Sequence, residues 1–304
     1  MISTKDLITA RIVADSINAQ GVRMTTMEIE YPRFILAELN THRMLSKNSA
    51  SSRAIPVKTM HEHIRANTAG PVYWGINQPG MKAKTEATGA DLTWANYLWN
   101  KARDSAIGYS ADLADLNIHK QITNRITEPW MVMKTVISGT EWVNFFWLRD
   151  HPDAQPEIAE LANKMRVAYD ASTPQLLNPG EWHVPYVNTY RGDVLIYSDG
   201  KGNTISPEEA RIVSASCCAQ VSYRKNDDSF EKALKIYNQL IESEPAHASP
   251  VEHQATPMMP SNWECDAEYW QEGITHVSRN GHLWSGNLRG WIQHRKLIAG
   301  EARW

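Results

Sequence analysis

The sequence predicts a mixed fold of helices and strands, and three observations lead to that prediction. The chain has 304 residues, of which 42% are hydrophobic and 21% are charged, so it can bury one large core or two modest ones. Residues 24–31 alternate as a half-buried strand does, whereas several longer segments repeat apolar residues at helical spacing. A disordered or fibrous chain is therefore excluded.

The first half should contain one strand among several helices. A capping pattern at Ser3 predicts a helix that ends at Gly21, ahead of the strand. Pro32 suits the first position of a second helix over residues 33–45, and the serine-rich residues 47–56 suit a loop. The further helices expected here cover residues 92–116, residues 135–148 and a segment that opens at Pro156. We expect these helices to form the core of the first half.

The second half is expected to form a different unit. The Pro-, Gly- and Asn-rich stretch over residues 175–205 marks a soft boundary, which divides the chain into regions 1–175 and 176–304. The elements expected in the second region are a short strand over residues 194–197 and helices over residues 208–222, 230–241 and 288–297. No short-period repeat interrupts either region.

The cysteines and histidines argue against a disulfide framework or a structural zinc site. Cys217, Cys218 and Cys265 lack CxxC spacing, which suits a reducing cytoplasm, and we expect the first two to be buried. His61 and His63 diverge on a helix, so an exposed turn is favoured over a metal site. The net charge is -3 and no apolar stretch approaches roughly 18 residues, so we expect a cytoplasmic protein that binds neither a membrane nor a nucleic-acid polymer.

The densest group of polar side chains lies between residues 38 and 53. It comprises Glu38, Thr41, His42, Arg43, Ser46, Asn48, Ser51, Ser52 and Arg53. Hydroxyls, backbone N–H groups and guanidinium groups at a helix end are the groups that bind the phosphate of a nucleotide. A solvated helix terminus followed by a serine loop is the alternative interpretation.

The spacing within this segment, THRMLSKNSASSR, is similar to the signature of flavin-dependent thymidylate synthases, the ThyX family. That signature is an Arg-His-Arg triplet followed by fixed serine and arginine positions. The matching residues are His42, Arg43, Ser46, Asn48, Ser51 and Arg53. Thr41 replaces the first arginine of the triplet, Glu38 replaces a glutamine and Ala54 replaces an aromatic residue. The chain thus resembles a divergent, phage-like member of the family.

A second segment, EWVNFFWLRDHPDAQPEI, looks like the family's later segment, in which an asparagine contacts the flavin and an arginine contacts the uracil ring. By position these roles fall on Asn144 and Arg149, and Arg125 aligns with a phosphate-binding arginine. Without the resemblance, Arg149 is a helix C-terminal charge, and Gln155 and Glu157 are first-turn residues of the next helix.

A third pair of segments, SASCCAQVSY and HASPVEHQATP, stands out of order. It resembles a stretch that lies ahead of the triplet helix in ordinary members, so the chain resembles a permuted or partly duplicated version. The matching positions are Ser222, Tyr223, Ser249, Glu252 and His253. The tail GNLRGWIQHRK echoes the triplet helix at Gln293, His294 and Arg295, although a solvated face or an interface is the alternative.

The resemblance implies a central antiparallel sheet flanked by long helices and a homotetramer that holds FAD at subunit contacts. It also implies reductive methylation of dUMP to dTMP, with methylenetetrahydrofolate as carbon donor and NADPH as reductant. The alternatives are hydroxymethylation of dUMP, action on another pyrimidine nucleotide, or a catalytically silent nucleotide-binding protein.

The resemblance also assigns roles to individual residues. The flavin-binding set is His42, Arg43, Asn144, Ser222 and His253. The nucleotide-binding set is Glu38, Ser51, Ser52, Arg53, Arg125 and Arg149. Ser51 and Arg149 are the expected catalytic residues, with Arg149 stabilising negative charge that develops on the pyrimidine ring. No metal is expected.

Overall fold

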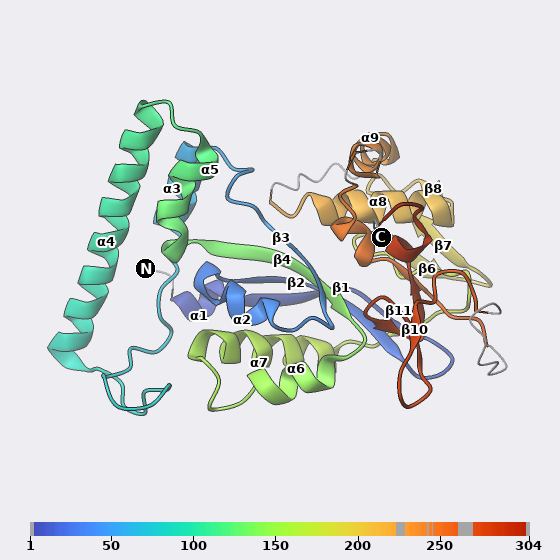
Figure 1. The fold of residues 1–304 in the computed structure, drawn as a ribbon, viewed down its shortest axis with the longest axis horizontal. Coiled ribbons are helices and arrows are strands. Elements are labelled where there is room, and N and C mark those ends of the chain that lie inside the picture. The colour runs from blue at the N-terminus through green and yellow to red at the C-terminus, as the bar shows by residue number, and fades with distance from the viewer. Residues whose placement is uncertain (1–2, 223–228, 242, 245, 261–269, 302–304) are drawn as a thin grey trace.

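The computed structural model describes residues 3–222, 229–241, 243–244, 246–260 and 270–301. Tyr223 and Cys265 therefore lie outside the described residues. Within the described part of the chain, the central sheet has five strands in the order β3-β4-β2-β1-β5 (Figure 1). The strands are β1 (Thr9–Ile17), β2 (Arg23–Pro32), β3 (Ser46–Ser49), β4 (Val132–Gly139) and β5 (Gln175–Leu176). Only the short β5 runs parallel to its neighbour, β1, so the predicted antiparallel sheet is confirmed.

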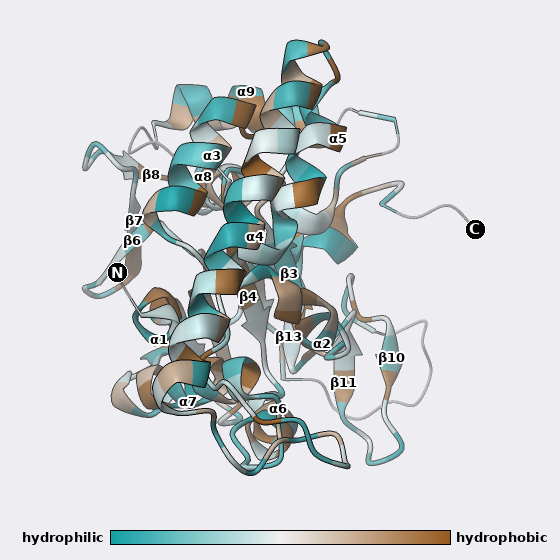
Figure 2. Cartoon of the chain, turned by 90° about the vertical axis from the view of Figure 1, so that its left-hand side faces the viewer, coloured by the Kyte–Doolittle hydropathy of each residue, from teal (hydrophilic) through white to brown (hydrophobic). Residues whose placement is uncertain are grey.

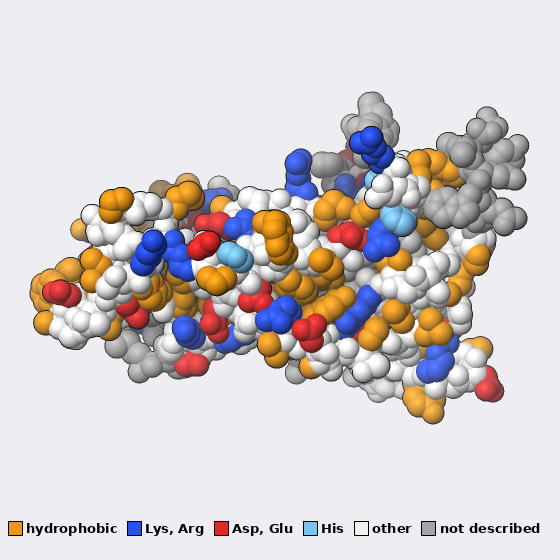
Figure 3. Space-filling model, turned by 90° about the horizontal axis from the view of Figure 1, so that it is seen from below, with side chains coloured by type: hydrophobic (Ala, Val, Ile, Leu, Met, Phe, Trp, Pro, Cys, Tyr) orange, Lys and Arg blue, Asp and Glu red, His pale blue; other side chains and the backbone are white. Residues whose placement is uncertain are grey.

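One face of the sheet packs against two helices, α6 (Trp142–Arg149) and α7 (Pro156–Ala171), as Figure 1 shows. Met27, Ile29 and Tyr31 of β2 are fully buried there because alternate residues of a strand point to the same face. The helix predicted from Pro156 is confirmed, with its apolar stripe in this core. On the surface below these helices, acidic and basic side chains are interspersed (Figure 3), as in the pairs of Lys164 with Glu160 and Arg166 with Asp150.

The helix α4 (Gly89–Asp115) lies at the edge of the molecule and confirms the helix predicted over residues 92–116. Its inner face packs on α3 (Val57–Ala66) through Ile107 and Trp99. Its outer face, seen in Figure 2, leaves Trp94 60%, Leu98 50% and Tyr109 67% exposed. The expectation that this stripe forms core is therefore wrong within the single chain.

Three short elements complete the first half, and two of them follow α4. They are α1 (Thr4–Leu7), α5 (Lys120–Thr123) and the 3-10 helix η2 (Asn124–Trp130). None of the helices in the described residues combines the length and the apolar character that crossing a membrane requires. His61 lies buried on α3 and hydrogen-bonds Ser110 at 2.8 Å, so the exposed turn expected there is wrong. In the described ranges, no group of three His, Cys, Asp or Glu side chains is arranged to hold a metal.

The second half covers the other face of the sheet with α8 (Pro207–Ala219), followed by α9 (Phe230–Ile241). Both helices and the strand predicted near residue 195 are confirmed, and Cys217 and Cys218 are buried as expected. The remaining elements are β6 (Asn188–Arg191), β7 (Leu195–Ser198), β8 (Thr204–Ile205), η3 (Ser249–Glu252), β9 (Ala255–Pro257), β10 (His276–Val277), β11 (Leu283–Ser285), β12 (Leu288–Arg289), β13 (Trp291–Gln293) and η5 (His294–Leu297). The two regions share a core cluster, because Met24 packs with Leu177 and Trp291.

Four sequence-based assignments need correction. The helix expected to end at Gly21 is mostly β1, because its residues pair with β2 over their whole length. The helix expected over residues 135–148 begins as β4, whose β-branched residues suit a strand, and becomes helical only at Trp142. The third assignment is the segment after Pro32, expected as a helix and a loop, which instead forms η1 (Arg33–Ile35), α2 (Leu36–Asn40) and then β3.

The fourth correction concerns the tail, which is extended rather than helical over residues 288–293. Gly286 and Gly290 have positive φ values of 59° and 71°, which interrupt a helix. A Cβ at Gly286 would also lie 2.8 Å from Oε1 of Gln293, so this turn requires glycine. The strand β13 then pairs with β9, which fixes the tail on the body of the protein.

Candidate active site

The segment of the first motif forms a turn, a strand and a loop along the edge of the sheet. Residues 41–45 form the turn, β3 is the edge strand paired to β4, and residues 50–55 form the loop. His42 and Arg43 therefore lie beyond one end of β3, whereas Ser51 and Arg53 lie beyond the other. We call these the His42 end and the Arg53 end.

At the His42 end, the structure brings Arg149 to the triplet. Nε of Arg149 donates a hydrogen bond to Nε2 of His42 at 2.8 Å, and its Nη2 donates to Oγ1 of Thr41 at 3.2 Å. Burial, together with the charges of Arg149 and Lys47, lowers the pKa of His42 to about 4. His42 is therefore neutral at pH 7 and accepts through Nε2, which leaves its proton on Nδ1.

Lys47 is a residue of this site that the motif comparison missed. Its Nζ donates to the carbonyl oxygens of His42 and Leu45, both at 2.6 Å. Burial lowers its pKa to about 8, and the charge of Glu252 partly offsets this. The sequence held no signal for this role, because Lys47 acts through backbone carbonyl oxygens that motif spacing does not reveal.

At the Arg53 end, neighbouring side chains bind the backbone of the loop, whereas the side chain of Arg53 is exposed. The backbone N–H of Ser51 donates to Oγ of Ser222 at 2.8 Å, so the first and third motifs are joined directly. Asn124 donates to the carbonyl oxygen of Ser52 at 2.8 Å, and Ser52 donates to Glu128 at 3.3 Å. Arg53 is exposed and forms no ion pair among the described residues.

Arg125 lies in η2, near the same loop. Its side chain is 60% exposed and its Nη1 lies 3.7 Å from Glu128, a carboxylate that also pairs with Arg33 at 2.9 Å. An exposed pair at this distance contributes little to stability. The guanidinium is therefore free to turn toward an anion.

A cavity of about 850 Å³ opens beside the Arg53 end, within the size range of small-molecule sites. Ala50, Ile55 and Ser222 line it next to the loop. On its floor Glu28 accepts hydrogen bonds from Arg11 and Tyr186, both at 2.8 Å. Burial alone would raise the pKa of Glu28, but these hydrogen bonds hold it below its ordinary value. The charges of the floor are thus neutralised within the protein.

His253 lies at the end of a buried chain of polar contacts that joins the two regions. Its Nδ1 and Oγ of Ser138 are 2.8 Å apart, and Thr26 joins Ser138 at 2.6 Å to His183 at 2.8 Å. His183 also hydrogen-bonds Ser16 at 2.9 Å. His253 is fully buried, and its Nε2 has no hydrogen-bond partner in the described ranges. Contact between His253 and a flavin therefore stays a prediction that requires this chain to open.

The other expected flavin residues lie at the surface. Asn144 is exposed on α6, and Arg43 is exposed in the turn of the His42 end. Oε2 of Glu38, on α2, is buried without a hydrogen-bond partner among the described residues. Glu157 is buried and accepts from the backbone N–H of Val72 at 2.8 Å, which favours the first-turn interpretation of this residue.

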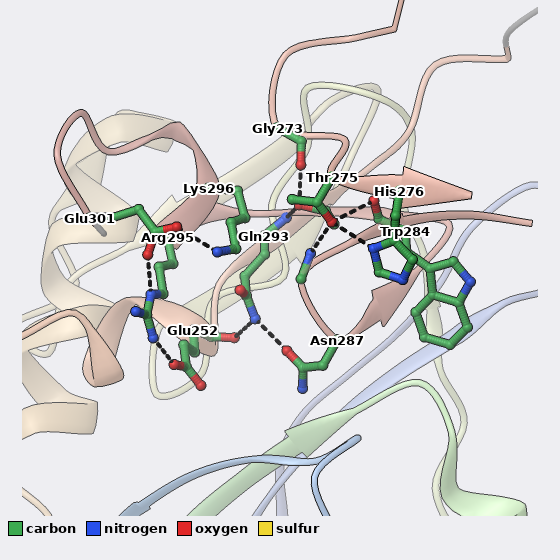
Figure 4. A network of polar contacts seen from close by, with 12 residues as sticks. Glu252, Gly273, Thr275, His276, Trp284, Asn287, Gln293, Arg295, Lys296 and Glu301 are labelled. Carbon is green, nitrogen blue, oxygen red and sulfur yellow. Dashed lines mark hydrogen bonds and ion pairs between the residues drawn. The ribbon is translucent and has the colours of Figure 1, made fainter. Parts of the chain in front are cut away.

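Asn287 and Gln293 of the tail belong to a polar network that also includes Glu252 and Arg295 (Figure 4), and Asn287 extends it to the first motif. Nδ2 of Asn287 donates to the carbonyl oxygen of Met44 at 3.1 Å and to Oγ of Ser46 at 3.0 Å. Nε2 of Gln293 donates to Oδ1 of Asn287 at 2.9 Å and to the carbonyl oxygen of Glu252 at 3.1 Å. Arg295 pairs with the side chain of Glu252, and Ser249 lies exposed at the start of the same 3-10 helix.

The second half of the tail is buried rather than solvated. Gln293 and His294 are 2% and 6% exposed, so the solvated face considered for this segment is wrong. The tail is an interface within the chain.

Comparison with known proteins agrees with the motif analysis. The profile of the family Thy1, thymidylate synthase complementing protein, matches residues 22–175, half of the chain. The first two motif segments lie inside that range, whereas Ser222, His253 and the tail lie outside it. No curated protein matches the chain significantly.

Two similar solved structures are of the UMP/dUMP methylase PolB from Streptomyces cacaoi. The complex with 5-Br UMP has 18% identity and a TM-score of 0.45, covering 53% of this chain and 88% of that one. The complex with 5-Br dUMP has 16% identity and a TM-score of 0.44, covering 53% and 89%. The profile match, which contains both the His42 end and the Arg53 end, shows that the chain belongs to the Thy1 family of flavin-dependent thymidylate synthases.

Proposed function

We propose that the protein is a flavin-dependent thymidylate synthase that reductively methylates dUMP to dTMP, with methylenetetrahydrofolate as carbon donor and NADPH as reductant. The observation that carries this proposal is the Arg53 end. Its loop is fixed from below by Ser222 and Asn124, while the guanidinium of Arg53 points to solvent without a carboxylate partner in the described ranges. A fixed loop with a free guanidinium and a serine hydroxyl is suited to a nucleotide phosphate.

Arg149 has the complementary role toward the base. Among the described residues it bonds to His42 and Thr41 rather than to a carboxylate, so its charge is not neutralised. A guanidinium in this state stabilises negative charge that develops on a pyrimidine ring as C5 becomes nucleophilic. Since His42 is neutral, it orients Arg149 without cancelling its charge.

The described residues fit a flavin in part. The exposed Arg43 and Asn144 offer a cation and an amide to the isoalloxazine or its phosphates. FAD, when bound, supplies the hydride chemistry. His42 and Ser222 support this site indirectly, because His42 accepts a hydrogen bond from Arg149 and Ser222 accepts one from the backbone N–H of Ser51.

We further propose that two copies complete one site, within a homotetramer. The His42 end and the Arg53 end stand at opposite ends of β3, and the 850 Å³ cavity borders only the second. The stripe on α4 supports association, because Trp94, Leu98 and Tyr109 are exposed along one side of the helix, and neighbouring exposed apolar side chains often mark an interaction surface. A groove of about 650 Å³ lined by Ala102, Ser105 and Leu116 lies on the same helix.

A second copy of α4 is the occupant that fits this stripe. In an antiparallel pair about a two-fold axis near residue 103, Leu98 faces Tyr109 of the other copy and Ala102 faces Ser105, so large side chains meet small ones. Lys101 then approaches Asp104 of the other copy, and both are exposed. The stripe also reaches Ile126, next to Arg125, so a partner docked there lies close to the Arg53 end.

The test is an absorbance spectrum of the purified protein under anaerobic conditions. Flavin bands at about 375 and 450 nm, a property of the cofactor, should appear with FAD and bleach with NADPH. Addition of dUMP and methylenetetrahydrofolate should then yield dTMP by mass spectrometry. Protein that takes up no flavin, even with dUMP present, contradicts the proposal.

Thr41 favours a second candidate. Where the family has an arginine, Thr41 accepts a hydrogen bond from Arg149 and donates one to the carbonyl oxygen of Glu38 at 2.7 Å. A changed flavin contact suits hydroxymethylation, another pyrimidine nucleotide, or binding without catalysis. The product mass distinguishes the first two from methylation, and flavin-free binding of dUMP identifies the third.

A further inference from the structure

We call residues 283–297, which contain the tail described above, the C-terminal clasp. The clasp lies outside the range that matches the family profile. It is firmly anchored to the body of the protein. Trp291 is fully buried and donates from Nε1 to the carbonyl oxygen of Val22 at 3.1 Å, and Asn18 donates to the carbonyl oxygen of Gly290 at 3.0 Å. The clasp is therefore a rigid part of the structure from which other groups can be held.

One contact of the clasp holds the turn that carries His42. This turn has no regular helix or strand, and side chains bind several of its carbonyl oxygens in addition to the backbone hydrogen bonds of the turn. Lys47 binds those of His42 and Leu45, and Asn287 binds that of Met44. Gln293 in turn fixes the amide of Asn287 by donating to its Oδ1.

A second contact of the clasp holds the helix that carries Arg149. Nε of Arg289 donates to Oε1 of Glu141 at 2.6 Å, and its backbone N–H donates to Oγ1 of Thr140 at 3.1 Å. Glu141 is the N-cap residue of α6, and Arg149 is the last residue of the same helix. The clasp thus holds the start of the helix whose last residue is Arg149.

We propose that Asn287 and Arg289 are positioning residues that hold His42 and Arg149 in register with each other. They lie two residues apart in one short, anchored segment. Asn287 contacts the turn that carries His42, and Arg289 contacts the start of the helix that carries Arg149, so the two residues support both partners of the Arg149–His42 hydrogen bond. That bond depends steeply on distance and angle, so a small displacement of the turn or of α6 breaks it. Its consequence for nucleotide binding rests on the proposed function, whereas its consequence for His42 does not.

The structural test is the titration of His42, followed by NMR and assigned with His42→Gln. In the wild-type protein, burial and the neighbouring Arg149 and Lys47 keep the pKa of His42 near 4. In Asn287→Ala and Arg289→Gln this pKa should rise in part, because displacement of Arg149 removes its charge from His42 while the burial remains, and Arg289→Lys, which keeps the charge opposite Glu141, should restore it. The matched controls are Asn280→Ala and Arg279→Gln, two exposed residues of the neighbouring hairpin, which should leave it unchanged.

The functional test is the Kd for dUMP of the flavin-loaded protein. Loss of one hydrogen bond to a backbone carbonyl should weaken binding about fivefold in Asn287→Ala, with no change in Asn280→Ala. An unchanged His42 titration in both Asn287→Ala and Arg289→Gln overturns the clasp, whatever the enzyme does. If wild-type protein binds no dUMP, the proposed function fails, and the titration still decides the role of the clasp. Should Asn287→Ala not fold, Arg289→Gln, altered at a partly exposed side chain, carries the test.

Discussion

The two ends of β3 differ in how their functional groups are held. At the His42 end, the imidazole is 9% exposed and its turn is bound by Lys47, Arg149 and the clasp. At the Arg53 end, the loop backbone is bound from below, while the guanidinium meets solvent. The first end is organised before any ligand arrives, and the second keeps a charge available for one. The proposed function, which requires binding of a phosphate and control of charge on a ring, would use both kinds of support.

The largest expected effect is on stability in acid, and it comes from the buried histidines of the His42 end and of the polar chain between the two regions. The folded-state pKa is about 4 for His42 and His183 and about 3 for His253, all lowered mainly by burial. Below about pH 6.5 these histidines are protonated in the unfolded chain but remain neutral in the folded protein, so the free energy of unfolding decreases as the pH falls from about 6.5 toward 4. Each histidine should cost about 2 kcal/mol at pH 5.

Urea unfolding at pH 7.5 and pH 5 measures this loss. His183→Gln should reduce the difference between the two pH values, although it also lowers stability at pH 7.5. His63→Gln, at an exposed histidine of α3, is the control and should leave the difference unchanged. Equal unfolding free energies at both pH values would show that the histidines are protonated in the folded protein.

The next effect tests the open end. Arg53→Ala should weaken dUMP binding about 10- to 100-fold, because a charge-assisted contact to phosphate is lost. The thermal midpoint should not change, since the side chain is exposed and unpaired within the described ranges. Calorimetry with Arg65→Ala, an exposed arginine of α3, provides the control. Equal weakening by Arg65→Ala would mean that only general charge matters.

The sequence predicted local features of this molecule better than those that depend on distant partners. The helices α4, α7, α8 and α9 and the strand β2 follow from their own periodicity and caps. The strand β1 was mistaken for a helix because Ser3 does cap a helix, but that helix ends at Leu7, and pairing with β2 decides the rest. At the tail, the positive φ values of Gly286 and Gly290 and the pairing with β9 outweigh helical spacing.

The same division holds for the candidate site. Motif spacing singled out His42, Ser51, Arg53 and Arg149 because the family resemblance assigns roles to these positions. It did not find Lys47 or Asn287, whose roles consist of contacts with carbonyl oxygens of the turn. Nor did it show that Ser222 binds the N–H of Ser51, because 171 residues separate the two.

A further prediction asks whether the two ends serve one site across copies. At a dUMP concentration no higher than the wild-type Kd, Arg53→Ala and Arg149→Ala should each have little activity alone. Mixed in equal amounts and allowed to exchange subunits, they should recover about a quarter of the wild-type sites, because half the pairs are mixed and each mixed pair keeps one intact site. Product formation and light scattering measure the outcome.

Ala102→Arg, placed on the exposed stripe of α4, should abolish that recovery and shift the protein toward monomer. Thr93→Arg is the control, because it is exposed on the same helix about 100° away from Trp94. Recovery that persists in the Ala102→Arg background would place the subunit contact elsewhere. No recovery in any mixture would place both ends in a single chain.

The smallest effect concerns the support beneath the open end. Ser222→Ala removes the acceptor for the N–H of Ser51, which should cost about 1 kcal/mol and weaken dUMP binding about fivefold, because the loop loses its orientation while Arg53 is retained. Ser278→Ala is a matched control, since Ser278 accepts the N–H of His282 at 3.1 Å in a hairpin turn away from β3. If both variants lose the same stability but only Ser222→Ala loses affinity, the hydrogen bond organises the site. If dUMP binds both equally well, the open end needs no preformed loop, and the contrast with the His42 end is greater than we describe.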